Sequence, residues 1–178
     1  MKDLFVIDLK DYDDNWPVYS RPSARAIIIK DDQVLLIYSR KYDYYKFPGG
    51  GIDKNETNID ALIREVKEET GYQIIPESIK EFGRVLRKQA DSFYDKQIFV
   101  QENFYYLCDI GDEIADIKLD DYEKDEGFTT VWINPLSAAK HNHDLKDFGA
   151  DKTLVNRDEK VLELLNDYLN GKIEIEGI

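Results

Sequence analysis

Apolar residues in this chain form short, nearly continuous runs in its first third. Two of these runs, residues 24–30 and 34–38, flank the polar triplet Asp31, Asp32 and Gln33, a pattern that predicts a β-hairpin. Polar residues hardly interrupt either run, which is typical of strands covered on both faces. We therefore expect a sheet that lies between two helical layers.

Further along the chain, apolar and β-branched residues predict more strands at 73–75, 80–87, 98–110 and 128–133. The polar segment 91–96 predicts a turn between two of them, and the polar pair Glu102 and Asn103 suggests an interruption of the long run. Residues 111–126 are acidic and are expected to form a loop.

Three segments have helical signals. Thr57 is a good N-cap, Asp60 completes a capping-box-like start, and Gly71 fits the left-handed position after a helix, so a helix is predicted over about residues 58–70. Pro135 is suited to the first turn of a second helix. Residues 158–169 have the one-sided apolar pattern of a third.

Length and composition narrow the class of protein. A chain of 178 residues without repeats or a Pro/Gly/Ser linker is expected to form one domain over 1–178, with 1–20 as an N-terminal extension. Its apolar run Leu4–Leu9 is expected to form either an extra edge strand or a partner surface. A single cysteine, Cys108, excludes an intrachain disulfide and is expected to be a buried core thiol. With no membrane-length apolar run and no signal-peptide pattern, we expect a cytoplasmic protein.

The helix at 58–70 places several carboxylates together. Glu65 and Glu69 are four residues apart at the edge of the apolar stripe, with Glu68 and Arg64 beside them. Like charges at this spacing, near the negative end of a helix dipole, cost stability. A hard divalent cation would offset that cost, and Glu69→Gln is expected to stabilise the metal-free protein slightly.

The same spacing resembles a known signature. The pattern is G-x5-E-x7-R-E-U-x-E-E-x-G-U, the Nudix box, where U is a bulky aliphatic residue. Its fixed positions are matched by Gly50, Glu56, Arg64, Glu65, Val66, Glu68, Glu69 and Gly71, and only Tyr72 departs from it. The chain thus resembles the Nudix hydrolase family over Gly50 to Tyr72, and more weakly over 21–139. The resemblance implies an α/β/α sandwich with a mixed β-sheet between helices.

The resemblance also implies a reaction. Nudix hydrolases use Mg²⁺ or Mn²⁺ to cleave a phosphoanhydride bond in a nucleoside diphosphate linked to another group, by attack of metal-activated water on phosphorus. It implies metal ligation by Glu65, Glu68, Glu69 and the Gly49 carbonyl, and a positioning role for Arg64. The alternative is a Nudix module that senses a nucleotide without cleaving it; loss of box glutamates would favour it, and none is lost.

Outside the box, Glu126 lies six residues before Trp132, where many Nudix proteins have a further glutamate, so it is a candidate ligand or base. The general base stays open among Glu65, Glu68 and Glu126.

The segment 39–47 interleaves aromatic and cationic residues. It favours substrate contacts by Arg40, Tyr44 and Lys46, with core packing as the alternative. A net charge of −13 argues against nucleic-acid polymers and anionic membranes as partners, and leaves a small phosphorylated nucleotide as the expected substrate. A homodimer is compatible with the sequence. The pair His141 and His143 lacks a third metal ligand nearby and is expected to be a solvated helix end.

Overall fold

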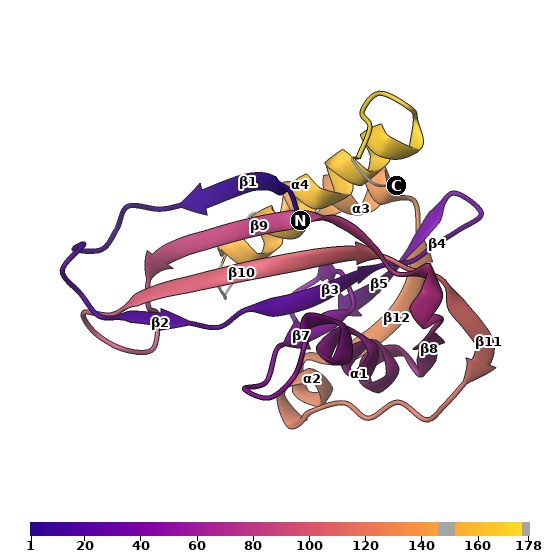
Figure 1. Ribbon diagram of the computed structural model, residues 1–178, viewed down its shortest axis with the longest axis horizontal. Coiled ribbons are helices and arrows are strands. Elements are labelled where there is room, and N and C mark those ends of the chain that lie inside the picture. Colours follow the sequence, from indigo (N-terminus) through magenta and orange to yellow (C-terminus); the bar gives the residue numbers. More distant parts are fainter. Residues whose placement is uncertain (146–151, 176–178) are drawn as a thin grey trace.

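The computed structural model describes residues 1–145 and 152–175. Within these ranges seven strands precede the first α-helix, and two helices follow the last strand (Figure 1). The strands are β1 (Asp3–Asp8), β2 (Val18–Ser20), β3 (Ser23–Ile27), β4 (Ile29–Lys30), β5 (Gln33–Ser39), β6 (Tyr44–Lys46), β7 (Gly49–Gly51), β8 (Tyr72–Ile74), β9 (Lys80–Ala90), β10 (Ile98–Leu107), β11 (Ile110–Ile114) and β12 (Phe128–Ile133). The helices are α1 (Asn58–Thr70), α2 (Asp121–Glu126), α3 (Pro135–Asp144) and α4 (Lys152–Leu169), with a 3₁₀ turn at Pro76–Ser78.

The largest sheet is mixed. Its strand order is β1-β9-β10-β3-β7, with β2 paired to β10. The pairs β1–β9, β10–β2 and β10–β3 are parallel, whereas β9–β10 and β3–β7 are antiparallel. A second sheet has the order β12-β5-β4, with β6 also paired to β5, and β11 pairs with β8. The N-terminal run therefore forms an edge strand, which was one of its two expected roles.

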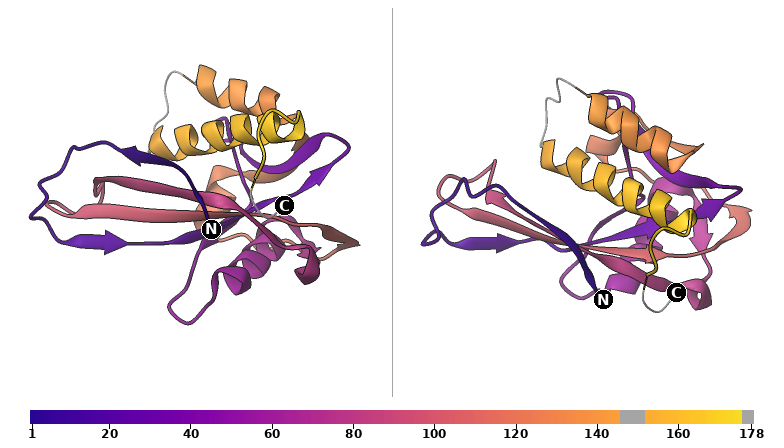
Figure 2. Two further views of the ribbon diagram at one scale, coloured as in Figure 1. Left: turned by 45° about the horizontal axis from the view of Figure 1, so that its top comes forward. Right: turned by 90° about the horizontal axis from the view of Figure 1, so that it is seen from above.

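Side chains alternate between two cores along the central strands, as the period of two in a strand requires. On β3, Ile27 belongs to the core beneath α3 and α4, whereas Ala26 belongs to the core beneath α1. On β5, Leu36 and Leu35 divide in the same way. Figure 2 shows α1 on one face of the sheet and α3 with α4 on the other, so the predicted sheet between helical layers is confirmed.

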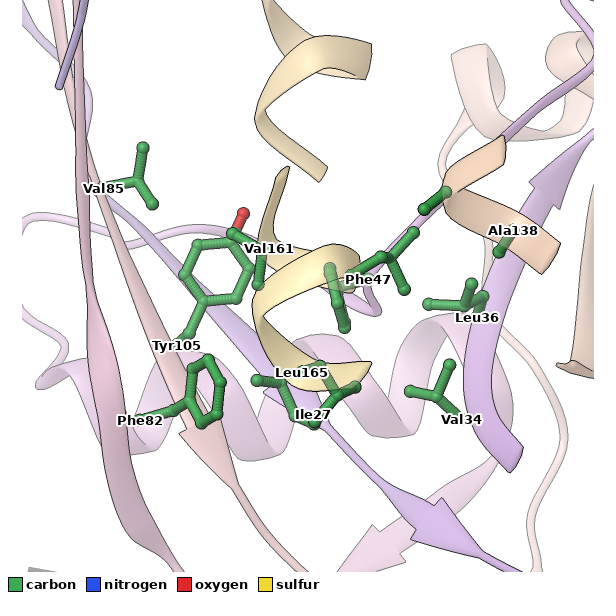
Figure 3. Packing of buried hydrophobic residues seen from close by; sticks show 12 residues of the cluster. Ile27, Val34, Leu36, Phe47, Phe82, Val85, Tyr105, Ala138, Val161 and Leu165 are labelled. Atoms are coloured by element: carbon green, nitrogen blue, oxygen red, sulfur yellow. The ribbon is translucent and has the colours of Figure 1, made fainter. Parts of the chain in front are cut away.

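The core beneath α4 is built around aromatic rings. The ring of Phe47 packs edge-on against Tyr105, with centroids 5.4 Å apart, and Val161 and Leu165 of α4 lie over them (Figure 3). Phe47 lies two positions before Gly49, with Pro48 between them, so this packing anchors the segment that leads into the glycine turn.

Two expectations from the sequence are wrong. Strand β10 passes through Glu102 and Asn103 without interruption, because the Asn103 side chain is satisfied inside the sheet by Ser23 and by backbone carbonyls. The acidic segment 111–126 is not a loop throughout, since it contains most of β11 and the whole of α2.

The strand predicted at 98–110 ends at Leu107, and Ile110 begins the separate strand β11. The other element predictions hold. The hairpin forms through the β4–β5 pairing, and the strand at 128–133 and the helix that begins at Pro135 are confirmed. Helix α4 begins earlier than predicted, at Lys152. Among the described residues, no helix combines the length and the apolar character needed to cross a membrane.

Candidate active site

Helix α1 is fixed at both ends by the residues that the sequence singled out. Thr57 and Asp60 form a reciprocal capping box, and Gly71 adopts the left-handed conformation at φ 75°. Leu62 and Val66 are fully buried against the sheet. This docking orients the helix so that Glu65 and Glu69, on the edge of the buried stripe, reach the glycine turn of β7.

The glycine turn allows close approach to the helix. Gly49 has φ 128°, and a Cβ added there would lie 2.1 Å from the Ala24 carbonyl oxygen. A Cβ added at Gly50 would lie 2.3 Å from Oε2 of Glu65. The backbone therefore requires glycine at position 49, whereas a side chain at position 50 would have to displace the Glu65 carboxylate.

Arg64 binds the partly buried carboxylates of the box. Its Nε and Nη2 donate to the two oxygens of Glu56 at 2.6 and 2.8 Å, and Nη1 donates to both Glu65 Oε1 at 2.7 Å and Glu68 Oε2 at 3.1 Å. Nη2 also donates to the Gly51 carbonyl at 3.2 Å. These contacts agree with a positioning role for Arg64.

Glu69 is held by a different cation. It is almost fully buried, and its Oε1 accepts from Lys46 Nζ at 2.6 Å while Oε2 accepts from the Gly49 amide at 2.7 Å. Lys46 is also buried, and its ammonium lies 4.5 Å from the centre of the Phe128 ring. The charge of Glu69 is thus balanced inside the protein, so the expected repulsion among three uncompensated glutamates is wrong for this residue.

Local environment changes the proton affinity of these groups. Hydrogen bonding from Arg64 lowers the pKa of Glu56 to about 2. For Glu65, burial raises the pKa, and the Arg64 contact opposes that shift only partly.

Glu123, a buried glutamate that the sequence analysis missed, lies next to the Lys46–Glu69 ion pair. Burial and then the neighbouring charge of Glu69 raise its pKa. Its Oε2 accepts from the Asp120 amide at 2.8 Å and its Oε1 from the Tyr122 hydroxyl at 2.9 Å. The signal that identifies α2 is the capping-box spacing of Asp120 and Glu123 followed by Gly127, the pattern that located α1.

The remaining predicted site residues are placed less centrally. Glu126 accepts at Oε2 from Ser39 Oγ at 3.1 Å and from the Tyr44 hydroxyl at 3.3 Å. Arg40 is exposed, and its side chain packs beside Gly127, after α2. The buried Tyr44 has its pKa raised by burial and by Glu126. Cys108 is a buried thiol whose pKa burial raises to about 12.

The histidines do not complete a metal set. His141 Nε2 lies 2.7 Å from the Asp43 carbonyl oxygen, and His143 Nδ1 lies 2.9 Å from Glu159. Among residues 1–145 and 152–175, no three His, Cys, Asp or Glu side chains are arranged as metal ligands.

The donor chemistry at α1 nevertheless fits a hard divalent cation. Glu65 and Glu68 converge on one positive group, the Arg64 guanidinium, and Glu69 already binds another, the Lys46 ammonium. Carboxylate oxygens that converge on cations are the ligands that Mg²⁺ and Mn²⁺ prefer. The Gly49 carbonyl, also expected as a ligand, accepts a hydrogen bond from Arg25 Nη1.

Comparison with known proteins identifies the same family as the box residues. The NUDIX domain profile matches residues 20–154. An RNA pyrophosphohydrolase of Xanthomonas campestris pv. campestris is 26% identical over 130 residues, which cover 68% of this chain and 62% of that protein. The RNA pyrophosphohydrolase of Hydrogenovibrio crunogenus is 28% identical over 123 residues, 64% of this chain and 73% of the relative.

Among solved structures, a NUDIX hydrolase from Nitrosomonas europaea matches with a TM-score of 0.57 and 20% identity, covering 89% of this chain and 94% of that one. At this identity the likeness concerns the fold alone. The Xanthomonas RNA pyrophosphohydrolase is longer than this chain, and the matched region spans 62% of its length.

Proposed function

The chain belongs to the NUDIX domain family, and from this premise we propose that it hydrolyses a phosphoanhydride bond in a nucleoside diphosphate linked to another group. The reaction depends on a divalent metal, Mg²⁺ or Mn²⁺. Water attacks phosphorus, and the bridging oxygen leaves with the other phosphorylated product.

One observation carries the proposal: three carboxylates of one helix, Glu65, Glu68 and Glu69, meet a glycine turn and are each already bound to a cation of the protein. A single guanidinium, that of Arg64, is shared by Glu65, Glu68 and Glu56, so the cluster keeps a surplus of carboxylate charge that a divalent cation can neutralise. A phosphoanhydride is anionic and repels nucleophiles, so a site that concentrates cations beside it lowers the barrier to attack by water.

Roles follow from the contacts. When a divalent cation is bound, it supplies charge neutralisation of the phosphate oxygens and lowers the pKa of water; Glu65, Glu68, Glu69 and the Gly49 carbonyl are the residues that would hold it. Arg64 keeps Glu65 and Glu68 together. If only one of Glu65 and Glu68 binds the cation, the other is our candidate to accept the proton from water. Glu126 remains a third candidate base.

The substrate is proposed only as a class. An acidic chain of net charge −13 favours a small nucleotide, nucleotide sugar or dinucleotide over a polymer. The relatives named RNA pyrophosphohydrolase favour a second candidate, the pyrophosphate group at an RNA 5′ end. A non-catalytic sensor is the third, and it requires binding without turnover.

A screen that follows release of the phosphorylated products by chromatography separates these candidates. Nucleoside di- and triphosphates, nucleotide sugars, dinucleoside polyphosphates and a 5′-triphosphorylated oligoribonucleotide are incubated with Mg²⁺, with Mn²⁺ or with excess EDTA. We expect metal-dependent release from at least one small nucleotide, faster at mildly alkaline pH. Release from the oligoribonucleotide alone would replace the small-molecule substrate by RNA, and binding without release from any compound would establish a sensor.

A further inference from the structure

A large cavity with an unusual charge lies beside the glycine turn. Its volume is about 1180 Å³, and four arginines line it: Arg21, Arg25, Arg87 and Arg157. Asp91 is the only acidic residue among its described lining residues. In a chain of net charge −13 this concentration of arginine marks a place that favours anions.

Arg25 connects the cavity to the candidate active site. It lies on β3, where it pairs with Gly49 across the β3–β7 ladder, and its Nη1 donates to the carbonyl oxygens of Phe47 and Gly49. Only 7% of Arg25 is exposed, and its buried Nε has no hydrogen-bond partner. A buried guanidinium N–H without an acceptor is costly, so the group is suited to an acceptor supplied by a ligand.

Arg21 provides a second cation at the same end. Its guanidinium lies beside Gly51, because a Cβ added to that glycine would be 3.4 Å from Arg21 Nε. Across the described part of the chain, the structure contains no ion pair or hydrogen bond of this guanidinium. Arg21 and Arg25 therefore present donors to one space, as phosphate recognition by arginine requires.

The other two arginines are fixed within the fold. Arg157 is fully buried; it donates to both oxygens of Asp158 and, through Nη1, to Asn103 Oδ1 at 2.7 Å. Arg87 donates to Thr153 and to Gln101. These two form the rigid floor of the cavity.

Aromatic rings line the end of the cavity away from the turn. The rings of Tyr19 and Phe99 are 6.2 Å apart, and the Arg87 guanidinium carbon lies 5.8 Å from the Phe99 centroid. Phe93, in the segment between β9 and β10, also lines the cavity although it is 89% exposed. Asp91 Oδ1 accepts from the amides of Phe93 and Tyr94, so the one acidic lining residue shapes the turn that presents these rings.

From this arrangement we propose that the cavity binds the nucleoside 5′-phosphate portion of the substrate. The phosphate contacts Arg25 and Arg21 next to the glycine turn, and the base stacks against Phe93 and Phe99. The next phosphate of the chain then reaches the α1 carboxylates, a step that rests on the proposed function, whereas the binding itself does not. The volume exceeds the usual 300–1,000 Å³ of small-ligand sites and leaves room for a nucleotide with a further group.

Binding without metal tests the proposal apart from catalysis. Isothermal titration calorimetry in excess EDTA is carried out with AMP, GMP, CMP and UMP as probes, and with the matching nucleosides. We expect at least one monophosphate to bind, and Arg25→Gln and Arg21→Gln each to weaken it by about tenfold or more while the nucleoside is affected by less than twofold. Phe93→Ala is expected to weaken nucleotide and nucleoside alike.

Arg84→Gln is the matched control, because Arg84 lies on β9 of the same sheet but pairs with Asp3 and Glu102 outside the cavity. Arg25 is buried, so its variant is checked by circular dichroism and a thermal melt; Phe93 is exposed and its variant has no reason to misfold. If Arg21→Gln and Phe93→Ala both bind within twofold of the Arg84 control, or if no monophosphate binds the wild type, the proposal is wrong. Binding that is lost in these variants, together with absent hydrolysis, would retain the cavity assignment and refute only the proposed function.

Discussion

The carboxylates of α1 and two arginines of the cavity, Arg21 and Arg25, meet at the glycine turn, but the fold satisfies them in opposite ways. Glu65, Glu68 and Glu69 each have a cationic partner within the protein. Arg25, by contrast, has only carbonyl oxygens as partners and keeps an unpaired N–H. The α1 carboxylates are paired with cations of the protein, whereas the described residues pair Arg25 with no carboxylate.

Because of this difference, a ligand must displace an internal partner in one region but not in the other. A cation that enters the α1 cluster must exchange with Lys46 or Arg64, so its affinity is reduced by the strength of those internal pairs. An anion that enters the cavity adds contacts without breaking any at Arg25. Variants that remove one partner from each region therefore test whether the two regions differ in this way.

The largest effect is expected for Glu65→Gln. The change keeps the shape that fits against Gly50 and removes one charge from the cluster. We expect kcat to fall about 1000-fold or more, which corresponds to about 4 kcal/mol of barrier, with an unchanged circular dichroism spectrum. Steady-state kinetics on whichever substrate the screen identifies measures this. Activity within threefold of wild type would remove Glu65 from the site.

Lys46→Met tests whether a bound divalent cation takes the place of the Lys46 ammonium beside Glu69. Without the ammonium, Glu69 is a buried carboxylate with no cation, and breaking a buried pair typically costs about 3–5 kcal/mol. We expect the metal-free variant to lose about 3 kcal/mol of unfolding free energy in urea melts. Excess Mg²⁺ should restore much of this loss, because a cation that binds only the native state stabilises it.

Glu69→Gln is the matched control for that experiment, since it removes the other half of the pair at nearly constant volume. It leaves Lys46 buried and without its anion, so we expect a loss of about 2 kcal/mol in EDTA, opposite in sign to the slight gain expected from the sequence. Here Mg²⁺ should restore little, because a ligand has been lost. Equal recovery of both variants with Mg²⁺ would contradict the exchange of Lys46 for metal.

The α1 cluster could be predicted from the sequence because its residues are contiguous and regularly spaced. Helical periodicity placed Glu65 and Glu69 on one edge, and Thr57 and Gly71 set the ends of the helix. The partner of Glu69 could not be predicted, since Lys46 reaches it from strand β6, 23 positions earlier. Lys46 was instead interpreted as a substrate contact.

The cavity was missed for the same physical reason. Arg25 and Arg157 come from β3 and α4, and only the packing of α4 against the sheet brings them together. Each is isolated in the sequence, and no local pattern links them. Helix α2 was missed for a different reason: acidic composition outweighed the capping-box signal of Asp120 and Glu123.

Glu56 offers a smaller effect with a defined pH dependence. Its pKa is about 2 in the folded protein because of Arg64, below the ordinary value near 4.5. A lowered folded pKa stabilises the protein above the unfolded pKa, and this contribution disappears as pH falls from about 4.5 through 2. Because the side chain is 21% exposed, solvent screening reduces the contribution to about 1 kcal/mol.

Urea melts of wild type and Glu56→Gln between pH 7 and pH 2 test this. At pH 7 the variant should be less stable by about 1 kcal/mol, and the two proteins should converge as the pH approaches 2. A difference that is constant over this range would mean that Glu56 acts through packing and not through its charge.

The smallest effect is expected for Arg40→Ala. Arg40 was chosen from its position in the sequence, whereas Arg25 was chosen from the structure, and the two variants are compared directly. Arg40 follows a strand that leads toward the site, yet its stem packs beside Gly127 and it is not among the described residues that line the cavity. A surface arginine at that place contributes to a substrate phosphate only through solvent-screened attraction. We expect KM to rise by at most threefold with kcat unchanged, against tenfold or more for Arg25→Gln. Both variants are measured at low and at 0.5 M salt, where the small effect of Arg40→Ala should vanish and that of Arg25→Gln persist. A tenfold rise in KM for Arg40→Ala at both salt concentrations would return Arg40 to the substrate site and place the phosphate on the α2 side of the glycine turn.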